Sequence, residues 1–151
     1  MTPAVIYDQL ITTLEGNPAL SAYIKRVFKG QRYDIVPEAL PCLMVEPVQN
    51  NDIEKDYGQV KNVYLSLDII AVAYNPNDFE KTIVGDNDYK GILDIENDVR
   101  ACLQSSNTLG DNVIDTIFAD PSIYDRTEVG KYPVRGVLIP VKILYRQTDG
   151  V

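Results

Sequence analysis

Residues 63–74, VYLSLDIIAVAY, constrain the fold of this chain more than any other stretch. Alternate positions from residue 65 onward are all apolar, whereas the positions between them mix Tyr, Ser and Asp with Ile and Val. A two-residue period of this kind predicts a β-strand. Because one face is purely apolar and the other is mixed, we expect an antiparallel sheet that is packed on one side only.

Helical signals lie on both sides of this strand. Thr followed by Pro at residues 2–3 predicts a capped helix start, and the apolar spacing after it continues to a stop at Gly16. Asn followed by Pro at residues 17–18 repeats that signal and predicts a second helix as far as about Phe28. A third helix is predicted over residues 88–103. The first two helices would form a hairpin with a very short joint.

The remaining apolar stretches predict short strands over residues 42–45, 113–119 and 134–146. Residues 49–58 are polar and acidic, which indicates a loop or a hairpin arm. Residues 75–88 and 120–131 are expected to be loops. Pro140 lies inside the last strand and cannot donate to a ladder, so we expect that strand to be an edge or bulged strand.

The order of these elements predicts an α+β fold over residues 1–151 as a single domain. We expect a mainly antiparallel (mixed) sheet of about four or five strands, with a helical hairpin and one further helix packed on it.

Composition excludes several classes of function. The chain has no histidine, so mechanisms that need an imidazole base or ligand are absent. The formal charge is −8, and residues 46–98 carry all of it, with twelve acids against four lysines. An acidic chain gains nothing from counterion release, so nucleic acid and membrane surfaces are not expected as primary ligands. We see no signal peptide and expect a cytosolic protein.

No catalytic, cofactor-binding or metal-binding residue is predicted. Cys42 and Cys102 match no metal or redox spacing and are expected to be buried free thiols. Residues 86–97 resemble a twelve-residue calcium loop but have Lys90 and Asn97 at two ligand positions. The acids there are better explained as caps at a helix start. Dense acids elsewhere, such as those of residues 94–98, indicate a solvated surface rather than acid–base catalysis.

Three segments are candidates for contacts with other proteins. The basic cluster of residues 25–32 either opposes the negative end of the predicted second helix or contacts an acidic surface, such as residues 46–98 of another copy. The acidic segment 49–58 and the long connection 75–88 are the others. The predicted interface residues are Lys25, Arg26, Lys29, Arg32, Asp52, Glu54, Asp56, Asn75, Asp78, Phe79, Glu80, Lys81 and Asp86.

The ordered pattern of segments resembles the tail-terminator or tail-completion proteins of long-tailed bacteriophages. It consists of PAVIYDQLITTLEGNPAL, LPCLMVEPV, VYLSLDIIAVAY, KGILDIENDVRACL and VRGVLIPVKILYR, and covers about residues 4–146. The closing strand, which opens on Val134-Arg135 and ends on Tyr145-Arg146, is its most suggestive part. The acidic residues 49–57 depart from the pattern.

The resemblance implies a structural virion protein and no enzymatic activity. Such proteins form a closed ring, usually a hexamer, that caps the tail tube, stops its polymerisation and joins it to the head-side connector. The implied partners are further copies of the chain, the tail-tube protein and the neck protein, with DNA only passing through the lumen. Assembly would take place in the host cytoplasm, and the protein would end in the tail–neck region of the virion.

Two alternatives stay open. One is a head-completion or neck protein of the same particle, and the other is a small-ligand-binding or enzymatic α+β domain.

Overall fold

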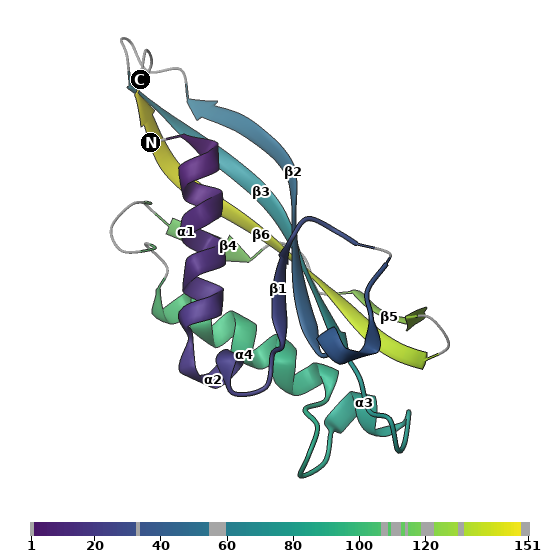
Figure 1. The fold of residues 1–151 in the computed structure, drawn as a ribbon. Coiled ribbons are helices and arrows are strands. Elements are labelled where there is room, and N and C mark those ends of the chain that lie inside the picture. Colours follow the sequence, from purple (N-terminus) through teal and green to yellow (C-terminus); the bar gives the residue numbers. More distant parts are fainter. Residues whose placement is uncertain are drawn as a thin grey trace.

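The computed structural model describes residues 2–32, 34–54, 60–106, 109, 113, 115–118, 123–129 and 132–148 (Figure 1). Its helices are α1 (Pro3–Gly16), α2 (Pro18–Ser21), the 3-10 helix η1 (Pro37–Ala39), α3 (Lys81–Val84) and α4 (Ile92–Ser105). Its strands are β1 (Arg26–Lys29), β2 (Cys42–Glu54), β3 (Val60–Ala73), β4 (Asp115–Phe118), β5 (Ile123–Val129) and β6 (Tyr132–Thr148). No helix in these ranges is long and apolar enough to cross a membrane.

The strands form one mixed sheet in the order β1-β2-β3-β6-β4, with β5 also paired to β6. Only the β1–β2 pair is parallel among these pairings. β4 pairs with residues 141–144 of β6 and β5 with residues 132–138, so these two short strands follow one another along β6. The predicted fold class, α+β with a mainly antiparallel mixed sheet and helices packed on it, is confirmed.

Helices α1 and α4 lie against one face of the sheet (Figure 1). The alternating apolar face predicted for β3 is the face that they cover, and the matching face of β6 from Val137 to Tyr145 is buried with it. Each fully buried aliphatic side chain contributes about 1.5–3 kcal/mol. The helical side chains that complete this core are Ile6, Leu10, Leu14, Ile95, Val99 and Leu103.

A second, smaller apolar cluster lies on the other side of the sheet, where the segment between β1 and β2 folds over it. Its buried members are Phe28, Leu40, Cys42, Met44, Val72 and Val134. Cys42 and Cys102 are both buried and free, as predicted. Burial raises the pKa of the Cys42 thiol to about 12, so this thiol is protonated at neutral pH.

The prediction of a helix over residues 17–28 is wrong beyond its first turn. Asn17 caps α2 as expected, its side chain accepting a hydrogen bond from the Leu20 N–H at 3.1 Å. The chain then leaves the helix, and the Lys25 N–H donates to the Pro41 carbonyl at 2.9 Å. Residues 26–29 pair with residues 42–45 and form the edge strand β1. Pairing with a distant strand has overridden the local helical spacing.

Two expectations about the C-terminal part are also corrected. Residues 120–131 are predicted as a loop, yet Ile123–Val129 is strand β5, which forms a hairpin with β6. The strand containing Pro140 is predicted as an edge or bulged strand, yet β6 lies inside the sheet. Pro140 pairs with Asp68 on the β3 side and falls between the stretches of β6 that pair with β5 and with β4. The missing proline N–H is tolerated at this gap.

The face of β3 that points away from α1 and α4 places two acids side by side. Asp68 is directly opposite Glu46 in the β2–β3 ladder. Burial, and next the neighbouring Glu46 carboxylate, raise the pKa of Asp68. The ionised form of Asp68 therefore costs stability at neutral pH, and this cost disappears as pH falls through the raised pKa to the ordinary aspartate value.

We expect Asp68→Asn to increase the free energy of unfolding at pH 7 by about 0.2–1 kcal/mol, the general size of a cross-strand side-chain interaction, because directly opposed like charges destabilise a sheet. The gain should shrink as pH falls and vanish below the ordinary pKa of aspartate, because Asp68 is then neutral in both the folded and the unfolded chain. Urea unfolding at several pH values measures it. Asp34→Asn, on an exposed side chain outside the sheet, is the control. A gain that is equal at all pH values would contradict the charge explanation.

Candidate functional site

The connection from Asn75 to Gly91 is a well-anchored structure rather than a loose loop. The buried Asn75 side chain accepts hydrogen bonds from the N–H groups of Asn77 (3.0 Å) and Asp78 (3.2 Å). Its amide nitrogen donates to Asp86 Oδ2 at 2.9 Å. Asp86 Oδ1 in turn accepts from the N–H groups of residues 88 and 89. The two ends of the connection are thus tied through one side-chain bridge.

The middle of this connection is fixed to the sheet. Thr82 in α3 is fully buried, and its hydroxyl donates to the Phe79 carbonyl at 2.6 Å. Arg135 of β6 donates from Nε to Thr82 Oγ1 at 3.2 Å, and its guanidinium lies 5.0 Å from the centre of the Phe79 ring. The sheet therefore holds α3 in one place.

Two glycines close the base of the connection. Gly85 has φ +88°, a conformation that L side chains rarely adopt. A Cβ on Gly91 would overlap the Ile83 carbonyl oxygen and lie 2.5 Å from the Val84 carbonyl carbon. The backbone therefore folds back on itself at this point.

Helix α4 begins only after this close approach. The prediction of a helix start at about residue 88, capped by Asp86, Asn87 or Asp88, is wrong: Gly91 is the N-cap of α4 and α4 begins at Ile92. Asp86 Oδ1 instead accepts hydrogen bonds from the backbone N–H groups of Asp88 and Tyr89, in the turn before α4. The hydrogen bond from the Asn75 amide is the largest cause that lowers the pKa of Asp86, and the two backbone hydrogen bonds lower it further.

The predicted interface residues of this connection divide into two groups. Asn75 and Asp86 have a structural role, and Phe79 lies partly buried beneath Arg135. Asp78, Glu80 and Lys81 have exposed side chains. The sequence analysis missed the apolar residues displayed here: Ile83 and Val84 are 39% and 70% exposed, and Leu93 at the start of α4 is 46% exposed. The signal was present as an Ile-Val pair inside an otherwise polar connection.

The predicted basic cluster lies on and beside the edge strand β1. Lys29 pairs with Asp8 of α1 at 3.1 Å, and the guanidinium groups of Arg26 and Arg32 lie 5.3 Å and 4.9 Å from the centre of the Phe28 ring. The explanation by a helix terminus is therefore wrong, because no helix ends here. Lys25 and Arg26 are exposed.

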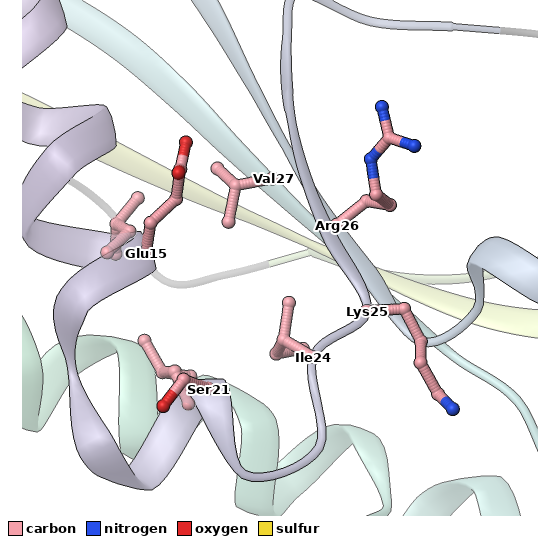
Figure 2. Close-up of a pocket in the computed structure, with 8 residues that line it drawn as sticks. Glu15, Ser21, Ile24, Lys25, Arg26 and Val27 are labelled. Carbon is pink, nitrogen blue, oxygen red and sulfur yellow. The ribbon is translucent and has the colours of Figure 1, made fainter.

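A pocket of about 400 Å³ lies next to this cluster, between the end of α1, α2 and β1. Figure 2 shows Ile24 and Val27 pointing into it, with Ser21 and Glu15 on the helical side. Lys25 and Arg26 also line it, although their side chains leave the chain on the other side from Val27 (Figure 2). Leu14 and Leu20 complete the apolar lining. The sequence analysis did not find this pocket.

The third predicted surface is not brought together with the other two. Asp52 and Glu54 belong to the distal part of β2, which ends at the opposite end of the molecule from α3 (Figure 1). Asp56 lies outside the described residues. The predicted alternative that residues 49–58 include a hairpin arm is confirmed as far as Glu54, since residues 49–52 and 54 pair with β3.

No protein-family model matches the chain, and no curated protein matches it. The arrangement of its surfaces therefore carries the functional argument. Two features stand out. One is the rigid connection of residues 75–91 with its exposed apolar tip, Ile83 and Val84, and the other is the pocket beside the edge strand β1. Both are features of protein–protein contacts.

We expect Gly91→Ala to lower the free energy of unfolding by about 1–3 kcal/mol, because the added methyl group overlaps the Ile83 carbonyl. Urea unfolding measures the loss, and hydrogen exchange of residues 75–91 shows whether it is local.

Gly16→Ala is the matched control, since a Cβ at that helical position meets nothing within 4 Å. It should leave stability unchanged or raise it by up to about 1 kcal/mol. Equal effects of the two substitutions would mean that residues 83 and 91 are not in close contact.

Proposed function

We propose that this chain is a structural virion protein: a tail terminator that assembles into a ring, a hexamer by its resemblance, on the end of a bacteriophage tail tube. The ring stops tube polymerisation and offers a new surface to the head-side connector. No bond is made or broken in this function, which depends on the shapes and charges of the docking surfaces.

The observation that carries the proposal is the presence of two different docking features on one small rigid domain. The exposed apolar tip of residues 75–91 is held in place by side-chain hydrogen bonds to its own backbone and to β6. The edge strand β1 and the pocket beside it form a separate surface. A subunit with two unlike surfaces associates head to tail, and head-to-tail contacts close into rings when the rotation allows it.

The charge distribution supports the same arrangement. Lys25 and Arg26 of the basic cluster line the pocket, whereas residues 46–98 carry a net charge equal to the whole −8 of the chain. Opposite charges on two surfaces of one subunit favour pairing between copies. An acidic ring would also let DNA pass through its lumen without adhering.

We expect ring formation to weaken as salt rises, because exposed charges are screened over a Debye length of about 8–10 Å. Lys25→Gln should weaken assembly at low salt and reduce its salt dependence, since the exposed Lys25 ammonium is removed. Light scattering after size exclusion, across a salt series, measures both. Assembly that is indifferent to ionic strength would contradict an electrostatic contribution to the interface.

The role in the particle is tested by mixing the protein with purified tail tubes or with emptied heads and imaging the mixtures by electron microscopy. A terminator caps tube ends, whereas a neck or head-completion protein binds the head portal. Normal virion maturation in the absence of the protein would overturn both roles.

A further inference from the structure

The apolar tip of residues 75–91 is exposed to water. This exposure is unfavourable, and a domain that binds no partner gains nothing from it. Val84 is 70% exposed and Ile83, its neighbour in α3, is 39% exposed. Leu93 adds a third exposed apolar side chain at the start of the next helix. Exposed apolar groups that are close in the chain and held on an ordered scaffold indicate a surface that another protein covers.

The backbone of this tip is held in one conformation before any partner binds. Thr82, between the helix start and the two exposed residues, is held by Arg135, and the Gly85–Gly91 approach fixes the turn that follows. Little conformational entropy is left to lose on docking, so even a small apolar contact adds to affinity.

The same chain carries a recess with apolar and charged walls. The pocket between α1, α2 and β1 is lined by the apolar Leu14, Leu20, Ile24 and Val27 and by the polar Glu15, Ser21, Lys25 and Arg26, and its volume of about 400 Å³ has room for the two α3 side chains. Ile24 and Val27 point into it from the segment that leads into and forms the edge strand (Figure 2).

The charges around the two features are opposite. Residues 78–94 carry five carboxylates against Lys81 and Lys90. The outer side of β1 displays the exposed Lys25 and Arg26. Glu15 lies on the α1 side of the pocket. The carboxylates around an incoming tip are therefore attracted by the cations on the β1 side and repelled by Glu15 on the α1 side.

We propose that Ile83 and Val84 of one copy insert into the pocket between α1, α2 and β1 of the next copy. This inference rests on the proposed function, because it supplies the subunit contact of the ring. The exposure of Val84 shows that the tip does not occupy the pocket of its own chain. Each copy therefore offers one tip and one pocket, and the contact is heterologous.

The experiment uses thiol cross-linking, because a disulfide traps the contact even when the subunits associate only weakly. Val84→Cys protein is mixed with Ser21→Cys protein under mild oxidation, since both positions are exposed. Val48→Cys replaces the first protein in the control, because Val48 is a comparably exposed valine (58%) in the middle of β2. The native Cys42 and Cys102 are buried and do not compete.

A disulfide-linked pair of one Val84→Cys chain and one Ser21→Cys chain, well above the control level, is the expected result. A cross-link at the control level overturns the proposal, whether the tip meets a different protein or the pocket holds a small molecule.

Substitutions that block each partner give a second readout. Val84→Asp and the pocket-filling Ser21→Phe should each weaken self-association roughly 10- to 100-fold, as hot-spot changes do. Val48→Asp should not. A mixture of the two blocked proteins keeps one intact tip and one intact pocket, so it should form pairs and nothing larger. Full-size assembly by either blocked protein would overturn the contact.

Failure of this contact and failure of the proposed function are distinguishable. If Val84→Asp protein still caps tail tubes as the unchanged protein does, the function stands and the contact is wrong. If the unchanged protein binds no tube end while the cross-link forms, the self-association stands and the terminator role is wrong.

Discussion

Burial of a single face of the β3–β6 ladder beneath α1 and α4 is the constraint on which the rest of the structure depends. The two strands pair without a break from Val60–Thr148 to Ala73–Arg135, and their alternate side chains form the main core. This long ladder fixes where every other element can attach. The short edge elements and the connection of residues 75–91 are thereby left to present surfaces rather than to hold the fold together.

Much of the fold was predictable because its determinants are local. The alternation of residues 63–74 identifies both the strand and its buried face, and Thr2 and Asn17 cap the helices that they were expected to cap. Where a distant partner decides the structure, the local pattern misleads. Residues 26–29 have helical spacing but pair with β2, and residues 123–129 are polar but pair with β6.

The candidate surfaces were less predictable than the fold. The length and polarity of residues 75–88 identified a segment of interest, but polar residue types do not reveal which side chains face inward. Asn75 and Asp86 are tied to each other, whereas the apolar pair that follows Thr82 is exposed beside the polar residues. The pocket was not predictable at all, because Leu14 and Val27 line the same pocket only once β1 has paired with β2. The helix predicted for Lys25 and Arg26 was wrong, because Arg26 begins the edge strand β1.

One carbonyl group of β2 anchors both α1 and β1, the helix and the strand that border that pocket. The oxygen of Val45 accepts the Tyr7 hydroxyl at 2.7 Å and the Gly30 N–H at 2.8 Å, so α1 and the end of β1 are both fastened to the same point of β2. A displacement of α1 relative to the sheet would stretch the Tyr7 hydrogen bond, and a displacement of β1 would stretch the Gly30 hydrogen bond. The helix and the strand that border the recess are therefore anchored to one strand, so its two sides move with the sheet rather than independently.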